Sequence, residues 1–392
     1  MPQLSLSKPL ATSQALVAER RALHTFNTVI APSIVSAFDV DFWTYDLLQT
    51  AEEFKTVQFA VAALAATYES CILYQNPSAA QKQFVLTQYS KSINSLRQYL
   101  GKTKFRNKTQ QSVVLITNYL LTFLCAIQGF HVEACSHLRS GLSLIHEWGL
   151  GMAEKKMPSR RIPSVISFLV TAFTQLDTQA RMKIEAIGSQ ECAYWRPHQA
   201  SLSSWESSHF KQTTYALAQL EALHNRAIQM AGNICPFSNH QPDGLTDFQN
   251  ELYSWDSTYA EYLCPWSDSA PSIHTLKLRR LLAQITWERG FIPGDPERFY
   301  TEKCRDIIHL AALIIEESGF EGKVMSFNPT GGLIEALYYV ATRCRDETVR
   351  WQAIGLMEKN AIVEALWEST SAARMAVAVV QHRPIKSEDL NY

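Results

Sequence analysis

Apolar residues recur along most of the chain at the spacing of α-helices. One stripe, typical of the pattern, is formed by Phe54, Val57, Val61, Leu64, Tyr68 and Cys71. Residues three or four positions apart share one face of a helix. The same period predicts later helices near Ser164–Lys183, His209–Ala231, Leu245–Tyr262, Ser272–Arg289, Glu297–Glu317, Gly332–Arg343, Glu347–Lys359 and Ser371–Gln381. No clear run of alternating β-branched residues competes with them, so the pattern predicts an all-α protein.

The predicted fold is a single compact array of about a dozen helices. Short loops between sequential helices favour antiparallel hairpins between neighbours. No stretch is long or low in complexity enough to mark a flexible linker, and no fixed repeat period is visible. We therefore expect one domain over residues 19–385, with a tail at 1–18 and another at 386–392.

An uncharged stretch, Ser112–Val132, is long enough to cross a bilayer. It contains Asn118, Gln128 and Gly129, and its apolar residues keep the helical period. No second stretch of this kind is evident, and no signal peptide is visible at the start. We interpret it as a buried core helix and expect no association with a membrane.

The net charge and the cysteines of the chain limit the classes of function that we expect. The 392 residues carry a formal net charge of −1. A domain that binds DNA without a partner usually has a clear excess of basic residues. The eight cysteines are scattered, without a C-x-x-C pair, which favours free thiols in a reducing compartment over a disulfide framework. Autonomous DNA binding is therefore not expected.

Two short features resemble binding sites. His131 and Cys135 lie four residues apart and could supply two metal ligands, but no second pair follows, so we favour a packed cysteine. The segment Phe327–Gly332, "FNPTGG", precedes a helix whose first amides could hold an anion. It lacks the lysine and spacing of a phosphate-binding loop. Thr330 as the N-cap of the following helix is the simpler interpretation.

A basic cluster lies in a polar stretch and consists of Lys155, Lys156, Arg160 and Arg161. Such a cluster is typical of a signal for nuclear import, and equally of a solvated loop.

The charged stretch Arg343–Met357, "RCRDETVRWQAIGLM", invites a catalytic interpretation, because arginines flank Cys344 and can lower a thiol pKa. Adjacent residues of a helix do not face each other, however, so the arginines can point outward and the thiol inward. We expect a turn between two helices, with Asp346 capping the second. Trp351, Ile354 and Met357 would then face the core. No catalytic, cofactor-binding or metal-binding residues are predicted.

Several segments together resemble the regulatory (middle homology) domain of fungal zinc-binuclear-cluster transcription factors. Phe38, Asp39, Asp41, Phe42 and Trp43 match an "FD-x-DFW" run, and "VQFAVAALAATYE" is similar to an alanine-rich family helix. "HLRSGLSLI" from His137 and the "RCRD" element from Arg343 follow in the expected order. "EALWES" from Glu364 resembles the family's "EGLWDS", with Ala365 and Glu368 as departures.

The resemblance implies an all-α fold, a nuclear setting and a regulatory role, often over a secondary-metabolite gene cluster. The resemblance does not extend to the family's DNA-binding module. That module is a six-cysteine zinc cluster with C-x-x-C pairs, and this sequence contains no such pair. We expect a regulator that acts through protein contacts, with the transcription machinery or with a DNA-binding relative, and that pairs with itself or with such a relative. No cofactor is expected. A sensor for a small-molecule effector on the same helices is the main alternative, and an enzyme that reuses the scaffold is a weaker one.

Overall fold

The computed structural model describes residues 8–102, 107–150, 165–187, 212–232, 245–260, 271–291, 297–320, 325–329, 331–382, 385 and 389. Within these ranges the chain divides into two compact units. The first comprises residues 1–35 and 40–134, and the second comprises 36–39 and 135–392. The predicted single domain over 19–385 stays a prediction. Helix α1 begins at Lys8, inside the segment expected to be a tail.

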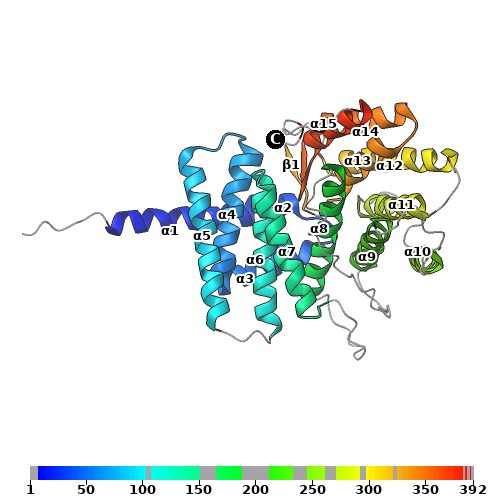
Figure 1. The fold of residues 1–392 in the computed structure, drawn as a ribbon. Helices are drawn as coiled ribbons and strands as arrows, with labels where there is room; N and C mark the ends of the chain where they lie inside the picture. The colour runs from blue at the N-terminus through cyan, green and yellow to red at the C-terminus, as the bar shows by residue number, and fades with distance from the viewer. Residues whose placement is uncertain are drawn as a thin grey trace, which may run out of the picture. The chain divides into compact units, whose positions relative to one another are not determined.

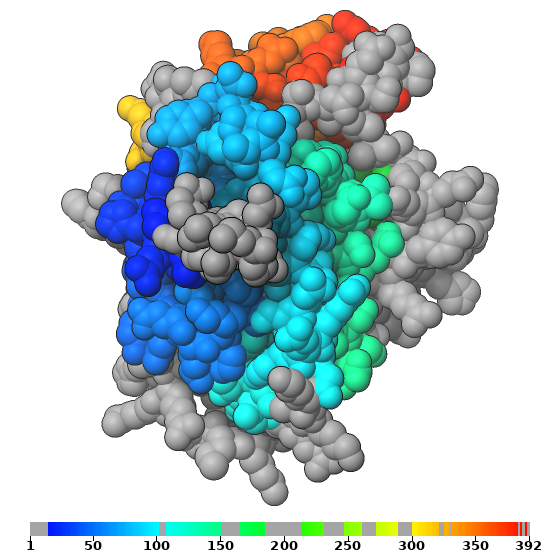
Figure 2. All heavy atoms as spheres, turned by 90° about the vertical axis from the view of Figure 1, so that its left-hand side faces the viewer, coloured from blue at the N-terminus to red at the C-terminus, as the bar shows by residue number. Residues whose placement is uncertain are grey.

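Every secondary-structure element within the described residues of the first unit is a helix (Figure 1). Its α-helices are α1 (Lys8–Thr25), α2 (Ala31–Ile34), α3 (Leu47–Glu53), α4 (Lys55–Thr67), α5 (Ala79–Lys102) and α6 (Lys108–Ile127). Three wider π-helical segments continue from or lead into them: η1 (Phe26–Ile30), η2 (Phe42–Asp46) and η3 (Tyr68–Leu73). Helix α4 packs against both α5 and α6. Helix α5 lies at the surface of this unit in Figure 2, where it is light blue.

Buried aromatic rings form the centre of the first unit. The Trp43 ring lies 5.0 Å from that of Phe42, and the Tyr119 ring lies 4.5 Å from that of Phe123, measured between centroids. Trp43 also contacts Tyr119 and Phe123, and all four side chains are at most 3% exposed. Phe42 and Trp43 of the "FD-x-DFW" run therefore belong to this core.

Helix α6 is buried along nearly its whole length, which confirms the expected core helix. Among the described residues, two segments have the length and hydropathy of a membrane span: Lys55–Leu73 and Lys108–Ile127. The expectation of only one such stretch was wrong. Most of each apolar window, 72% and 83%, is buried inside the structure, as in the core helices of soluble proteins.

The second unit contains the remaining described elements. Its α-helices are α7 (His131–Glu147), α8 (Val165–Ile187), α9 (Gln212–Gly232), α10 (Leu245–Tyr259), α11 (Pro271–Phe291), α12 (Glu297–Glu317), α13 (Leu333–Arg343), α14 (Glu347–Lys359) and α15 (Ser369–Val380). Consecutive helices pack together in the pairs α8 with α9, α11 with α12, and α13 with α14, and α9 also packs on α11. The all-α prediction is confirmed, with α12 and α14 at the predicted bounds.

The core of this unit forms where α9, α10 and α11 meet. The Phe248 and Trp287 rings stack at 4.2 Å, and the Trp255 indole donates to the Ala216 carbonyl at 3.0 Å. Phe38, from the same "FD-x-DFW" run, joins this cluster. The run therefore contributes to both cores.

A small sheet joins the last helices. Strand β1 (Ser326–Phe327) runs parallel to β2 (Ile362–Glu364), and β2 pairs antiparallel with β3 (Trp367–Glu368). The pairing sets Phe327 opposite Val363, and Glu364 opposite Trp367. The strands are too short to show an alternating pattern, so the sequence did not reveal them.

Candidate functional site

The loop before α13 does hold an anion, but the anion is part of the protein. The Glu364 carboxylate accepts hydrogen bonds from the backbone N–H groups of Gly332 at 2.9 Å, Leu333 at 3.3 Å and Ile334 at 2.9 Å. The amides that open a helix lack partners within the helix and attract negative charge. Glu364 lies at the end of β2, so the sheet carries this carboxylate to the start of α13.

The predicted N-cap of α13 was wrong. The residue at the cap position is Gly332, which has no side chain, and Glu364 supplies the missing acceptor. Thr330 lies outside the described residues. Gly332 has φ of 101°, a conformation that favours glycine. A Cβ atom there would also overlap the Arg279 guanidinium. The "GG" of the loop is therefore required by backbone shape and by close approach.

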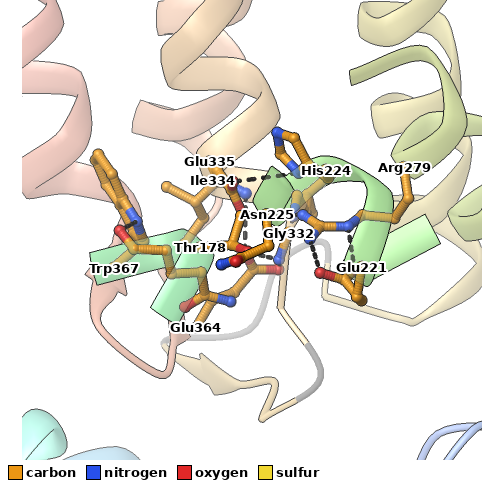
Figure 3. A network of polar contacts seen from close by, with 12 residues as sticks. Thr178, Glu221, His224, Asn225, Arg279, Gly332, Ile334, Glu335, Glu364 and Trp367 are labelled. Carbon is orange, nitrogen blue, oxygen red and sulfur yellow. Dashed lines mark hydrogen bonds and ion pairs between the residues drawn. The ribbon is translucent and has the colours of Figure 1, made fainter. Parts of the chain in front are cut away.

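Arg279 on α11 connects this cap to a buried ion network (Figure 3). Its Nε and Nη2 donate to the two carboxylate oxygens of Glu221 on α9, at 2.6 Å for the Nε bond. Its Nη1 donates to Glu335 Oε2 on α13 at 2.9 Å. These three side chains are at most 1% exposed. One cation thus ties together three helices that are far apart in the sequence.

The buried carboxylates differ from surface ones in their protonation. Burial raises the pKa of Glu335 to about 7, against the opposing effect of Arg279. Burial likewise raises the pKa of Glu364 to about 7, although the amides of Ile334 and Gly332 oppose it. Removal from water destabilises the charged form of a carboxyl group. Near neutral pH both groups therefore lie close to the midpoint of their titration.

His224 on α9 completes this side of the network. Its Nε2 lies 3.3 Å from Thr286 Oγ1, and its Nδ1 lies 3.9 Å from Glu335 Oε1. Burial and the neighbouring Arg279 charge hold the pKa of His224 well below its usual range. The imidazole is therefore neutral at physiological pH.

A second polar cluster joins α8 to α9. Asn225 Nδ2 donates to Asp177 Oδ2 at 2.9 Å and to Thr178 Oγ1 at 3.0 Å. Arg181 Nε also donates to Asp177 Oδ2, at 3.0 Å. On the same helix, the backbone carbonyl of Gln179 accepts from the Trp367 indole at 3.2 Å. Trp367 of the "EALWES" segment is thus anchored to α8.

The chemistry available to the network follows from its burial. The four titratable groups around Arg279 (Glu221, His224, Glu335 and Glu364) are at most 1% exposed, so a substrate has no route to them in this conformation. Removing one partner of a buried ion pair leaves an uncompensated charge, which strongly destabilises a fold. The network therefore fixes how α9, α11, α13 and β2 meet. It is therefore a structural centre.

Sequence analysis did not predict this network of Arg279 with Glu221, His224, Glu335 and Glu364. One signal was present: Glu335 is the single charged residue in the run Leu333–Ala341. A lone charge in an otherwise apolar helix usually requires a buried partner. Nothing in the local pattern names that partner, because Arg279 and Glu364 belong to other elements.

The "RCRD" turn is organised as predicted. Asp346 is the N-cap of α14, where its Oδ1 accepts from the Val349 N–H at 3.2 Å, and its Oδ2 accepts from Arg305 Nη2 at 2.6 Å. Arg343 and Arg345 are exposed, whereas Cys344 is 2% exposed and points inward. The charged stretch is therefore a helix boundary.

One part of that prediction was wrong. Ile354 and Met357 are each 1% exposed and face the core, but Trp351 is 41% exposed. Positions 351 and 354 are separated by about 300° around a helix, and 351 and 357 by about 600°, so the three do not form a narrow stripe. Trp351 instead lines a shallow groove between α12 and α14, together with Ile308, Ala312 and Leu356.

The two departures in "EALWES" have structural roles. Ala365 has φ of +45°, the left-handed conformation that glycine adopts without strain, and glycine is the residue of the resembling motif at this position. Glu368 caps α15, where its carboxylate accepts from the N–H groups of Thr370 at 2.8 Å and Ser371 at 2.7 Å. The shorter aspartate of the motif is the commoner cap.

The other predicted features are placed as follows. His131 and Cys135 lie in the first turns of α7, and no group of three or more potential metal ligands occurs in the described ranges. The described cysteines, Cys71, Cys125, Cys135, Cys304 and Cys344, are free thiols. The basic cluster of Lys155, Lys156, Arg160 and Arg161 lies outside the described residues.

Comparison with known proteins identifies the family. Residues 21–314 match the family described as the fungal specific transcription factor domain. The chain belongs to this family. The matched residues include the "FD-x-DFW" run and the "HLRSGLSLI" segment. The match ends before the "RCRD" and "EALWES" segments. The resemblance of those two segments to the family therefore rests on their own residues and not on this match.

A curated relative agrees with the family. The chain is 33% identical over 63 residues to the aspercryptin biosynthesis cluster-specific transcription regulator atnN of Emericella nidulans. The similar stretch covers 16% of this chain and 10% of that regulator. No solved structure matches the chain. The comparisons therefore support a transcription-regulator-like role for this family domain.

Proposed function

We propose that this chain regulates transcription through contacts with other proteins, as a helical regulatory domain. The observation that carries the proposal is the family match over residues 21–314. The interior supports a binding role more than a catalytic one, because the cluster of titratable groups around Arg279 is sealed from solvent. Its partners would be the transcription machinery or a DNA-binding relative.

The charge of the chain favours protein partners over DNA. The sequence has a net charge of −1 and contains no C-x-x-C pair, so these residues offer neither an overall basic excess nor a zinc-cluster pattern. A DNA-binding relative would supply contact with the promoter, and this domain would supply regulation.

A tethering experiment tests the proposal. The chain is fused to an unrelated DNA-binding domain and directed to a reporter promoter in a fungal host. We expect reporter transcription to change relative to the DNA-binding domain alone. The matched control is a fusion carrying Arg279→Ala, which removes the shared cation of the buried network. In parallel, purified chain is added to promoter DNA; tight, sequence-specific binding by the pure protein would contradict action through protein contacts alone.

The target and location form a finer part of the proposal. We infer regulation of a secondary-metabolite gene cluster, supported by the printed name of the relative, which is a cluster-specific regulator. Deleting the gene and sequencing transcripts would then show a contiguous set of genes losing expression. A fluorescent fusion would accumulate in the nucleus, and replacing Lys155, Lys156, Arg160 and Arg161 by alanine would reduce this accumulation.

A small-molecule sensor is the second candidate, and a pocket favours it. A cavity of about 340 Å³ is lined by Trp255, Leu281 and Leu310, with Lys277, Arg280 and His309 among its polar residues. Its size is at the lower end of ligand pockets. A compound that binds only the native state raises its melting temperature. Thermal-shift measurements with small aromatic carboxylates, repeated on Leu281→Gln, would show a shift in the parent only.

A further inference from the structure

Helix α14 leaves one of its faces uncovered. The helix packs against α12, α13 and α15, and its buried residues are Val349, Ala353, Ile354 and Met357. The opposite face lies beside α12 (Figure 1) and borders a groove of about 680 Å³. The groove is lined by Thr348, Trp351, Gln352, Gly355, Leu356 and Lys359 of α14 and by Ile308 and Ala312 of α12. An exposed tryptophan in a partly apolar groove is typical of a protein-binding surface.

Gly355 lies at the centre of this face. Successive residues of a helix are about 100° apart, so Trp351 and Lys359, four residues before and after Gly355, lie about 40° to either side of it. A glycine inside a helix destabilises that helix relative to alanine. Gly355 does not have a positive φ, and a Cβ atom added to it would meet no atom within 4 Å. The described part of this chain therefore does not require a glycine here, whereas a second helix passing close to this point would.

We propose that this face binds the same face of a second copy of the chain, with the two α14 helices antiparallel and crossing at Gly355. The contact between two identical surfaces has a twofold axis, and every pair of facing residues occurs twice. With the axis at Gly355, residues equally far before and after it face each other. Trp351 of each copy then faces Lys359 of the other, and Gln352 faces Glu358.

The facing residues are complementary in charge. A lysine ammonium over a tryptophan ring is attracted to it, and Trp351 meets Lys359 in this way. The Trp351 indole donates to the Glu347 carboxylate at 3.4 Å, so this carboxylate lies beside the same ring and attracts the same lysine. The Gln352 amide can donate to the Glu358 carboxylate, and all these side chains except that of Gly355 are exposed.

The charges also set the direction of the two helices. Helix α14 begins with the acidic Glu347 and ends with the basic Lys359. An antiparallel pair brings the acidic start of one copy to the basic end of the other and sets the two helix dipoles in opposite directions. A parallel pair would place like charges together at both ends. The face is therefore complementary to itself in one orientation only, which favours a second copy as the occupant.

The predicted dimer is weak and names one partner of the proposed regulatory domain. One helix pair with its groove forms a small interface, so we expect a dissociation constant in the micromolar range. This inference deepens the proposed action through protein contacts and rests on it. The experiments below use purified chain and no reporter, so a failure here leaves the outcome of the tethering experiment unaffected, and the two proposals can fail separately.

Charge reversal tests the orientation of the pair. Sedimentation velocity over a concentration series measures the association of wild type, Glu347→Lys and Lys359→Glu. Each variant alone should associate about 100-fold more weakly, because like charges then meet twice in the dimer. An equimolar mixture of the two variants should return to within about tenfold of wild type, because one copy then presents two positive charges and the other two negative ones. Both positions are exposed, and far-UV circular dichroism checks that each variant is folded.

Replacement of the central glycine tests the crossing point. Gly355→Ala should raise the melting temperature of dilute, monomeric protein by about 2 °C, because alanine favours the helix and its Cβ meets nothing in this chain. The same variant should weaken association about tenfold, because the added Cβ separates the two helices. Gly101→Ala in α5 is the matched control: a Cβ there also meets no atom within 4 Å, and association should not change.

Three results would overturn the proposal. The first is a wild-type chain that stays monomeric up to about 100 μM, well above a micromolar dissociation constant, which would leave the groove to a different protein. The second is a mixture of Glu347→Lys and Lys359→Glu that associates no better than either variant alone. The third is a Gly355→Ala variant that associates as tightly as the wild type, which would place the contact on another face.

Discussion

Helices α13 and α14 follow one another in the chain, and each begins against a carboxylate, but the two caps are built in opposite ways. Asp346 lies directly before α14 and is partly exposed, and its cap is local. Glu364 lies about 30 residues after the start of α13 and is fully buried, and the sheet brings it there. The first cap requires only the right residue at the right position. The second requires most of the unit to be folded.

The two caps also respond to pH with opposite signs. Hydrogen bonds from the Val349 amide and the neighbouring Arg305 lower the pKa of Asp346, so its contribution is present above its ordinary pKa and is lost in acid. Burial raises the pKa of Glu364, so its contribution is greatest in acid and is lost as the pH rises toward 7. At neutral pH, a capping carboxylate that is partly exposed to water therefore keeps its contribution to stability, whereas a buried one loses part of it.

Removing the buried cap should have the largest effect. Glu364→Ala leaves the amides of Gly332, Leu333 and Ile334 buried without acceptors, and we expect a loss of about 3–5 kcal/mol in the free energy of unfolding. Urea unfolding measures it. Glu364→Gln keeps one acceptor oxygen and should lose less. A loss below about 1 kcal/mol for the alanine variant would mean that water replaces the carboxylate.

The pH dependence of the buried network comes next. The pKa values of Glu335 and Glu364 are about 7, above their ordinary value of 4.5, so the native state holds protons that the unfolded chain releases between pH 4.5 and 7. Stability from these groups should fall across that window, by on the order of 3 kcal/mol for each group. His224 acts in the opposite sense, because its depressed pKa destabilises the native state in acid.

Comparison with Glu335→Gln isolates the carboxyl contribution, since His224 remains in both proteins. The unfolding free energy of the wild type minus that of the variant should decrease as the pH rises from 4.5 to 7. A difference that stays constant across this window would show that Glu335 titrates normally.

Removing the local cap should have a smaller effect. Asp346→Ala should lower the free energy of unfolding by roughly a third as much as Glu364→Ala. Asp346→Asn keeps a capping oxygen and removes the charge, so it separates the cap from the ion pair with Arg305. The part of the wild-type advantage that depends on the Asp346 charge should be lost as the pH falls below 3.8. If stability is unchanged but reporter regulation is lost, the turn is a regulatory site after all.

The smallest effect is expected in the turn that carries the buried cap. Ala365 follows Glu364 with a positive φ, so Ala365→Gly should relieve strain and stabilise the protein by about 0.5–1 kcal/mol. Ala373→Gly, in the interior of α15, is the matched control and should destabilise by about 1 kcal/mol. Equal signs for the two variants in thermal unfolding would contradict this account of Ala365.

The quality of the sequence predictions follows the same division between local and distant interactions. The bounds of α12 and α14 were predicted correctly, because periodicity and capping act over a few residues. The prediction that Trp351 faces the core was wrong because it used residue spacing alone, which does not tell which side of α14 packs against α13. The strands escaped notice because two or three residues carry no period.

By itself, the sequence determined the helical class, the bounds of α12 and α14, the Asp346 cap and the likeness to fungal transcription regulators. These follow from residues close together in the chain or from motifs in a fixed order. Only the tertiary structure decided that Glu364 closes the start of α13 and that Arg279 lies between Glu221 and Glu335. The reason is physical: a buried charge needs a partner, and the partners of these charges come together only when distant helices pack.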